Sequence, residues 1–255
     1  MLNMSMSELL KLAIAQGKMP RYLYKYTTAD NAIRAIEDGT VYFAQFSQFN
    51  DEYEGFVNLD TSFSSQDWAN FLVQNGIFGW EASFLMNTVK TNPAQAAEII
   101  KKTIEENQNN NGFFCLTPNP NNVLMWAHYA DQNKGCCLGY DLLADTELFS
   151  HIRKVEYGDN TIAYNYLHNN GGAMDAMFHK SKQWEYEDEY RVIWINQHGA
   201  RKVKDGSLCK IIFGSKIDVK KEGEIKVKIK GMKVVPDLFR AVKGDNPKEM
   251  DIVAC

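Results

Sequence analysis

Strand-type segments occur near both ends of the chain with helical segments between them, and this order is what most limits the fold. Residues 22–26 alternate in the manner of a strand, and residues 41–43 form a second short strand-type run. A helix is predicted between them over residues 29–38, ended by Gly39. From Arg153 onward strand-type segments predominate again. This order predicts an α+β fold in which helices are inserted between strands.

The centre of the chain is predicted to be helical. Ser64 or Ser65 is a suitable cap for a helix through Phe71, and Asn92 followed by Pro93 is a typical helix start. That second helix runs toward the asparagine-rich residues 107–111. We expect the helices of about residues 60–111 to form an insertion in the fold or a lid against the sheet.

The domain boundaries follow from these segments. An amphipathic helix from Ser5 to Gln16 precedes the first strand. We therefore predict an N-terminal helix within residues 1–20 and one α+β domain over residues 21–255, with mixed or antiparallel sheets. Further strands are expected at residues 112–117, 135–140, 154–157, 190–195, 208–213, 225–229 and 233–235.

The segment 224–230 alternates strictly between isoleucine or valine and charged residues. As a strand it would place Ile225, Val227 and Ile229 inside and lysines outside, which is typical of a guarded edge strand. The alternative is a basic patch for nucleic acid, since the residues from Ala200 onward carry a net charge of +6 and the remainder −10.

Composition excludes several classes of protein. The net charge of −4 argues against a protein that wraps nucleic acid over its whole surface, and 45% hydrophobic residues allow a sizeable core. No apolar run approaches the roughly 20 residues that cross a bilayer, and no secretory signal is recognisable, so we expect a cytoplasmic protein without membrane contact. The five cysteines and five histidines lack metal-site spacing, and we predict no metal site.

The densest group of candidate catalytic residues is Trp184-Glu-Tyr-Glu-Asp-Glu-Tyr-Arg191, which enters an apolar strand. If the strand begins early, Glu185, Glu187, Glu189 and Arg191 share one face. Neighbouring carboxylates move one another's pKa values apart, and an arginine holds one of them ionised. Such a pair suits a site where one carboxylate stabilises positive charge and the other accepts a proton. The alternative is an exposed acidic strand end with an ordinary ion pair.

Three other segments offer candidate binding residues, each with a structural alternative. His128, in a helix predicted to begin at Asn122, is a candidate general base or phosphate donor, or a hydrogen-bonded core histidine. Asn50 lies in a polar loop that either binds a ligand or forms an Asx turn. The alternating Tyr22, Tyr24 and Tyr26 form either a stacking surface for a base or an aromatic core.

The order of several motifs resembles a widespread bacterial family of unknown function, domain-of-unknown-function family 2971. The resemblance extends from about Arg21 to Val242 and implies no activity by itself. The motifs are Leu23-Tyr-Lys-Tyr26, Phe49-Asn-Asp51, Phe114-Cys-Leu-Thr117, Met125-Trp-Ala-His-Tyr129 followed by Gly135 and Gly139-Tyr-Asp141, and Trp184-x-x-Glu-x-Glu-Tyr-Arg191.

A second resemblance is to ADP-ribosyltransferase-like folds, through a basic residue on the first strand, a later hydroxyl and a Glu-x-Glu before a strand. It implies that Lys25 contacts the dinucleotide phosphates and that Thr117 braces the nicotinamide ribose. Glu189 would hold a ribose hydroxyl, and Glu187 would orient or deprotonate the acceptor. The chain departs from that pattern, which usually has Arg or His in place of Lys25 and a Ser-Thr-Ser run where this chain has only Thr117.

The resemblance therefore implies an enzyme that cleaves NAD and transfers ADP-ribose to a protein or nucleic acid, in a defence or toxin context. NAD would be a substrate, and the small-molecule partner a nucleotide. The implied catalytic residues are Glu189, Glu187 and His128. The implied NAD-binding residues are Lys25, Tyr24, Tyr26, Thr117, Asn50, Trp126, Tyr129 and Arg191.

Two other functions fit the same residues. In the first, the chain is a non-catalytic binding or regulatory domain whose Glu-x-Glu segment is structural. In the second, it is a metal-dependent nuclease or phosphoesterase, because hard cations prefer carboxylate oxygens. The ligands would then be Asp51, Glu54, Glu187 and Glu189.

Overall fold

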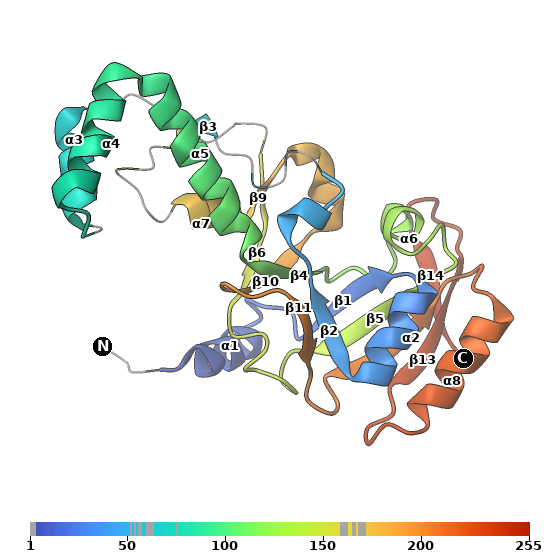
Figure 1. Ribbon diagram of the computed structural model, residues 1–255. Helices are drawn as coiled ribbons and strands as arrows, with labels where there is room; N and C mark the ends of the chain where they lie inside the picture. Colours follow the sequence, from blue (N-terminus) through green and yellow to red (C-terminus); the bar gives the residue numbers. More distant parts are fainter. Residues whose placement is uncertain are drawn as a thin grey trace.

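The computed structural model shows a body of sheets and helices from which a helical arm projects (Figure 1). It describes residues 4–51, 53, 55, 58–59, 64–74, 76–158, 163–164, 167 and 172–255. Glu54, one of the metal ligands considered above, lies outside these residues, as do residues 60–63 at the start of the predicted insert. No helix in the described ranges is both long and apolar enough to cross a membrane.

Both helices and strands occur along the whole of the described chain. The helices are α1 (Met6–Ala15), α2 (Ala29–Asp38), α3 (Ser65–Gln74), α4 (Gly79–Thr91), α5 (Pro93–Asn109), α6 (Val123–Tyr129), α7 (Gly172–Ala176) and α8 (Val219–Ile229), with 3-10 helices η1 (Phe46–Gln48) and η2 (Lys182–Glu187). The strands are β1 (Tyr22–Thr27), β2 (Thr40–Phe43), β3 (Asn58–Leu59), β4 (Gly112–Leu116), β5 (Cys136–Asp141), β6 (Ile152–Lys154), β7 (Glu156–Tyr157), β8 (Ala163–Tyr164), β9 (His179–Lys180), β10 (Tyr190–Trp194), β11 (Gly199–Lys202), β12 (Leu208–Phe213), β13 (Asp237–Lys243) and β14 (Met250–Ala254).

The predicted strand-helix-strand opening is confirmed. The Thr28 hydroxyl accepts a hydrogen bond from the Asn31 amide and caps α2, and Gly39 ends the helix in the left-handed region at φ 56°. Ile33 and Ile36 are buried on the face of α2 that packs on the sheet. This segment can be predicted from the sequence because a capping residue marks each end of its helix.

The larger sheet has five strands in the order β1-β5-β12-β13-β14. Its pairs are antiparallel except β12 with β13, which is parallel, so the sheet is mixed as predicted. Helices α2 and α8 lie side by side over one face, and α6 packs on the other (Figure 1). The molecule is therefore an α+β protein with helices on both faces of its main sheet.

A second, three-stranded antiparallel sheet has the order β4-β10-β6. It meets the larger sheet where Tyr24 of β1 pairs with Thr117, just after β4. On its other side, Phe113 of β4 pairs with Ala44, which follows β2 of the β2–β11 pair. Smaller pairs are β2 with β11, β3 with β8 and β7 with β9.

The predicted strand at residues 225–229 is wrong, because these residues form the last turns of helix α8. Asp218 caps the helix by accepting hydrogen bonds from the amides of Lys220 and Lys221. Ile225 and Ile229 are buried one turn apart, whereas Val227 is 68% exposed. The alternation of residue types fits a strand, but only Ile225 and Ile229, which are four residues apart, face the core, as expected for a helix.

Three of the four lysines of α8 pair with acidic residues. Lys221 bonds to Asp30, and Lys228 Nζ lies 3.1 Å from a carboxylate oxygen of Glu37, both on α2. Lys226 pairs with Glu222 within the helix at 2.8 Å. Residues 225–229 are therefore not a guarded edge strand, and three of the lysines lie against carboxylates.

Three other strand predictions need correction. Residues 154–157 are divided into β6 and β7 because the buried Val155 lies between them and donates its amide to the Glu189 carbonyl. Residues 233–235 are a loop before β13. The acidic segment does not begin its strand early, because residues 182–187 form η2 and Asp188 takes a left-handed conformation at φ 45°.

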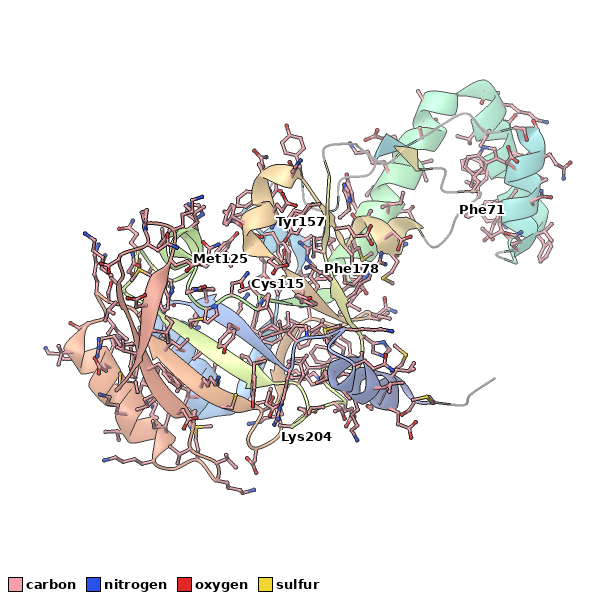
Figure 2. All side chains as sticks on the ribbon, turned by 180° about the vertical axis from the view of Figure 1, so that it is seen from behind. Phe71, Cys115, Met125, Tyr157, Phe178 and Lys204 are labelled. Carbon is pink, nitrogen blue, oxygen red and sulfur yellow. The ribbon has the colours of Figure 1, made fainter. Side chains whose placement is uncertain are left out.

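The predicted insert forms an arm of the helices α3, α4 and α5, which projects from the body and does not cover the sheet as a lid (Figure 1). Asn92 caps α5 as predicted, but α4 was not foreseen. The arm joins the body near the C-terminal end of α5, where the Asn109 carbonyl accepts a hydrogen bond from Gln45 Nε2 at 2.7 Å. In Figure 2, Phe71 lies in this arm, whereas Cys115, Met125 and Tyr157 lie in the middle of the molecule.

Candidate functional site

The candidate site lies where the two larger sheets meet. Tyr24 pairs with Gly139 of β5 on one side and with Thr117 on the other. The Tyr24 amide donates to the Thr117 carbonyl at 2.7 Å, and the Thr117 amide returns a bond to the Tyr24 carbonyl at 2.9 Å. A cavity lies beside this bridge and is lined by residues of both sheets.

The cavity has a volume of about 220 Å³. Its walls come from the bridge, from the loop after β2, from β4, from α6 and from the acidic segment before β10. The lining residues are Tyr24, Lys25, Tyr26, Ala44, Gln48, Phe49, Asn50, Phe113, Cys115, Leu116, Thr117, Met125, Tyr129, Lys180, Glu187 and Glu189. Eight of the predicted site residues are in this set, namely Tyr24, Lys25, Tyr26, Asn50, Thr117, Tyr129, Glu187 and Glu189.

Glu189 is bound in two places by the guanidinium of Arg191. Arg191 Nε donates to Glu189 Oε1 at 2.7 Å, and Arg191 Nη2 donates to Oε2 at 2.9 Å. Arg191 is fully buried, its Nη1 donates to the Met177 carbonyl at 2.6 Å, and its guanidinium lies 5.5 Å from the Phe49 ring centre. A bidentate contact of this kind fixes both the position and the orientation of the carboxylate.

Burial would raise the pKa of Glu189, but the positive charges around it outweigh that effect. The charge and hydrogen bonds of Arg191, the charge of Lys180 and a hydrogen bond from the Cys115 thiol lower its pKa to about 2. Burial and the Glu189 charge raise the pKa of Cys115, so the thiol keeps its proton. Glu189 is therefore a fixed negative charge against the cavity at neutral pH.

Glu187 is held by a different set of groups. Lys180 Nζ donates to Glu187 Oε2 at 2.7 Å, and the Tyr129 hydroxyl donates to Oε1. Asn50 Nδ2 donates to the Tyr129 oxygen at 3.2 Å. Both carboxylate oxygens of Glu187 therefore accept a hydrogen bond. One of the two donors, the Tyr129 hydroxyl, belongs to a residue that also lines the cavity.

The pKa of Glu187 is raised, in contrast to that of Glu189. Burial is the largest cause, and the negative charge of Glu189 adds to it, while Lys180 and Tyr129 oppose the rise. Burial and Glu187 also raise the pKa of the Tyr129 hydroxyl, which keeps its proton. The two buried glutamates therefore differ in acidity, with Glu189 ionised and Glu187 closer to taking up a proton.

Lys25 contributes a cation from the side of the cavity formed by β1. Its ammonium lies 6.0 Å from the centre of the Phe114 ring and forms no ion pair with a carboxylate within the part of the chain that is described. A half-buried ammonium beside a cavity attracts an anionic ligand. Lys25 differs in this respect from Lys180, another lining residue, whose ammonium forms ion pairs with both Glu187 and Glu189.

Gly135 and Gly139 allow β1 and β5 to approach each other closely beside the bridge. A Cβ on Gly139 would lie 2.9 Å from a ring carbon of Tyr24, so only glycine lets this ring lie across β5. A Cβ on Gly135 would lie 2.1 Å from the Thr27 carbonyl oxygen, so any side chain there would displace β1 from β5. Both glycines position the strand that carries Tyr24 and Lys25.

Three predicted site residues do not line the cavity. His128 lies on the exposed face of α6, with Nδ1 3.0 Å from the Tyr186 hydroxyl. Trp126 of α6 is fully buried, and its Nε1 donates to the Pro120 carbonyl at 2.9 Å, so its side chain packs the helix onto the core. Arg191 lies behind Glu189 and reaches the cavity only through it. Glu185, expected on the same face as Glu187, is exposed.

Sequence reasoning missed Lys180, Cys115 and Phe49 as parts of this site. Lys180 is 5% exposed, and no neighbouring pattern marks it as buried. The signal in the sequence is the run of acidic residues after Lys180. Buried carboxylates need cations, and Arg191 alone cannot pair with both Glu187 and Glu189. Phe49 and Cys115 were named only as members of family motifs.

A metal site finds no support in the described residues. No group of three or more His, Cys, Asp or Glu side chains in them is arranged to hold a metal ion. Glu187 and Glu189 are already paired with Lys180 and Arg191, which leaves no net negative charge for a divalent cation. Asp51 accepts a hydrogen bond from the Tyr53 amide at 3.0 Å and does not line the cavity.

Comparison with known families finds one match, which covers part of this site. Residues 125–192 match the family model described as protein of unknown function (DUF2971). The match supports the first resemblance, and it includes Tyr129, Lys180, Glu187, Glu189 and Arg191. No curated protein and no solved structure matches the chain. The matched segment thus contains both glutamates and both of their cations, while Lys25 and Thr117 lie outside it.

The arrangement has the parts needed for a reaction with a cationic transition state. One cavity is lined by a fixed carboxylate (Glu189), by a second carboxylate that accepts protons more readily (Glu187), and by an ammonium without a carboxylate partner among the described residues (Lys25). Fixed charges in a site that excludes water stabilise a transition state more than they would in water.

Proposed function

We propose that the chain is an ADP-ribosyltransferase-like enzyme that binds NAD at this cavity, cleaves it and transfers ADP-ribose to a protein or nucleic acid. The observation that carries the proposal is that Lys25, Thr117 and Glu189, which are far apart in sequence, line one cavity. The three side chains offer a cation, a hydroxyl and an anion, which correspond to the phosphates, ribose hydroxyls and developing positive charge of NAD.

The size of the cavity agrees with part of the dinucleotide being enclosed. Cavities that hold a whole drug-sized ligand have about 300–1,000 Å³, whereas this one has about 220 Å³. The nicotinamide and its ribose would enter, between Phe49, Phe113 and Tyr24. The diphosphate would lie toward Lys25, and the adenosine would extend outside. Aromatic walls suit the flat nicotinamide ring.

The chemical step follows from the charges. The bond between the ribose carbon and the nicotinamide nitrogen breaks, its electron pair leaves with nicotinamide, and positive charge develops on the ribose. Glu189 accepts a hydrogen bond from a ribose hydroxyl and stabilises that charge. A hydroxyl or amine of the acceptor then forms a bond to the ribose carbon. Its proton passes to the Tyr129 oxygen while the Tyr129 proton passes to Glu187.

The non-catalytic alternative explains the ion pairs but not Lys25. A purely structural network would have its charges compensated, as Glu187 and Glu189 are by Lys180 and Arg191. The ammonium of Lys25 faces the same cavity without a described carboxylate partner. A cation in that position is better suited to holding an anionic ligand than to holding the fold.

The test is the release of nicotinamide from NAD by the purified chain, without added metal. Glu189→Gln keeps the size of the side chain and removes its charge, and we expect the rate to fall at least 100-fold, as for removal of one preorganised charge-stabilising group. Lys25→Met should raise KM for NAD, because Lys25 binds the diphosphate.

Matched controls exist for both variants. Glu185→Gln removes an exposed carboxylate from the same segment, and Lys204→Met removes an ammonium from the surface far from the cavity. Both should leave the rate unchanged. If the wild-type chain releases no nicotinamide, or if Glu189→Gln is as active as Glu185→Gln, the proposal is wrong. Activity that appears only with added magnesium would instead favour the metal-dependent alternative.

A further inference from the structure

Lys180 lies between the two glutamates of the site. Its ammonium is 2.7 Å from Glu187 Oε2 and 3.5 Å from Glu189 Oε2. The side chain is buried, although lysine is almost never fully buried unless it is paired. Lys180 therefore contacts both carboxylates that the proposed reaction uses.

The position of the Lys180 side chain is fixed from several directions. Its backbone pairs with Tyr157 in the β7–β9 ladder, and its carbonyl accepts a hydrogen bond from the Gly158 amide at 3.0 Å. The ammonium also lies 4.9 Å from the centre of the Trp184 ring. Trp184 belongs to η2, the same short helix that carries Glu187. Lys180 thus ties β9 to η2 and to the start of β10.

We propose that Lys180 is the positioning residue that gives the two glutamates different tasks, by holding Glu187 against the Tyr129 hydroxyl while Arg191 holds Glu189. The proposal rests on the proposed transferase function for the tasks themselves. Lys180 is a positioning residue because it acts through Glu187, whose other oxygen is bonded to Tyr129.

The physical reason is that two carboxylates in one buried site cannot both stay ionised without separate cations. Arg191 contacts only Glu189 of the two, through a bidentate pair. Glu187 has Lys180 as its cation. Without Lys180, the pKa of Glu187 would rise further, and Glu187 would already carry a proton over a wider pH range. A protonated Glu187 could not accept the proton of the acceptor through Tyr129.

Other titratable groups also face this pair, and none of those described is a second cation for Glu187. Tyr129 approaches from α6, Tyr157 from β7 and Tyr186 from η2, and each influences or is influenced by the charge of Glu187. Glu189 adds a negative charge, with Arg191 and Cys115 around it. The tyrosines are neutral at physiological pH, so Lys180 carries the electrostatic control of Glu187.

The experiment compares Lys180→Met, which removes the charge, with Lys180→Arg, which keeps it. Lys154→Met is the matched control, because Lys154 is half exposed and pairs with Asp188, between the two glutamates in sequence. Two quantities are measured: the titration midpoint of the Glu187 carboxyl carbon by NMR, assigned with Glu187→Gln, and the pH profile of kcat for nicotinamide release from NAD.

We expect Lys180→Met to raise the Glu187 midpoint by about one to three pH units, the usual effect of losing an adjacent opposite charge. The acid limb of kcat should move in the same direction. Lys180→Arg should restore both toward the wild-type values, and Lys154→Met should change neither. An unchanged Glu187 midpoint in Lys180→Met would overturn the proposal, and so would a lower kcat that Lys180→Arg does not restore.

Two further results separate the possible failures. If Lys180→Met does not fold, the double variant Lys180→Met, Glu187→Gln removes both charges and should fold. Failure of the double variant as well would make Lys180 a packing residue and contradict the proposal. If the wild-type chain releases no nicotinamide, the transferase function has failed, and the NMR midpoints still decide whether Lys180 controls Glu187.

Discussion

The sheet body and the helical arm differ in where they keep their charged and aromatic side chains. In the body, Arg191 and Lys180 are buried with their carboxylate partners. In the arm, Trp80 of α4 is 76% exposed and Phe84 is 61% exposed. The arm's ion pairs, such as Lys101 with Glu105, are exposed and lie one helical turn apart.

This difference reflects how each region is held together. The body depends on contacts between segments distant in the chain, such as the bridge of Tyr24 with Thr117 and the pair of Lys180 with Glu187. The arm depends mainly on local helix formation, with a small buried contact around Trp68 and Leu72. Regions with few buried contacts open at lower free-energy cost. We therefore expect the body to respond cooperatively to a change and the arm to respond locally.

The largest effect is expected from breaking the buried ion pair of the body. Arg191→Met leaves the Glu189 charge buried without its bidentate partner and with Lys180 alone at 3.5 Å. Removing one member of a buried pair typically costs about 3–5 kcal/mol of the free energy of unfolding. Denaturant unfolding followed by circular dichroism measures it. The double variant with Glu189→Gln should recover much of the loss, because no unpaired charge remains. A loss below about 1 kcal/mol in Arg191→Met would show that the pair behaves like an exposed one.

Acid should weaken the body through Glu189. Its pKa falls from an ordinary 4.5 to about 2 on folding, so its stabilising contribution is present above pH 4.5 and is lost as the pH falls toward 2. The upper limit of the loss is about 3 kcal/mol, since one pKa unit corresponds to 1.36 kcal/mol. Glu187 acts in the opposite direction, because its raised pKa favours the folded state on proton uptake.

Unfolding free energies between pH 7 and pH 2, measured for the wild type and for Glu189→Gln, separate these two effects. The difference between the two proteins should shrink as the pH falls below 4.5. A constant difference across that range would contradict the low pKa of Glu189.

A cavity in the arm should have a smaller and more local effect. Leu72→Ala removes one of the few buried side chains of α3 and should lower the local stability by about 2 kcal/mol, the low end for a buried leucine, because the site is open enough to relax. Amide hydrogen exchange should become faster in α3 and α4 and stay unchanged in β5 and β12. Equal acceleration in the body would show that the two regions unfold together.

The helix caps offer the most closely matched comparison and the smallest effect. Asp218 caps α8 in the body, and Asn92 caps α5 in the arm. Replacing either by Ala should cost about 1 kcal/mol in its own helix. We expect Asp218→Ala to lower the free energy of global unfolding and Asn92→Ala to change only the exchange of the arm. Indistinguishable denaturation curves for the two variants would remove the distinction between the regions.

Sequence reasoning succeeded where local chemistry determines the structure. The helix over residues 29–38 has a threonine cap and a terminal glycine, and α5 has an asparagine cap followed by proline. It failed at residues 225–229, because alternation and helical spacing both include Ile225 and Ile229. Packing against α2 decides between them, and sequence patterns do not contain that information.

The candidate site shows the same division. Glu187, Glu189 and Arg191 could be found because they lie close together in the chain, although the strand geometry expected for them was wrong. Lys25 and Thr117 entered through a family resemblance, since nothing in their neighbourhood reveals that they meet. Lys180 was missed because its burial depends on the β7–β9 ladder and on Glu187, which are tertiary features.

The measurement that tests the central claim most directly is a calorimetric titration of the wild-type chain and of Glu189→Gln, Lys25→Met and Glu185→Gln with NAD. A ligand that binds only the folded state also raises its unfolding temperature, which gives a parallel readout. We predict saturable binding of one NAD to the wild type and to Glu185→Gln, weaker binding to Lys25→Met and altered binding to Glu189→Gln. Absence of binding up to millimolar NAD, or identical binding by all four proteins, would contradict the assignment of this cavity to NAD.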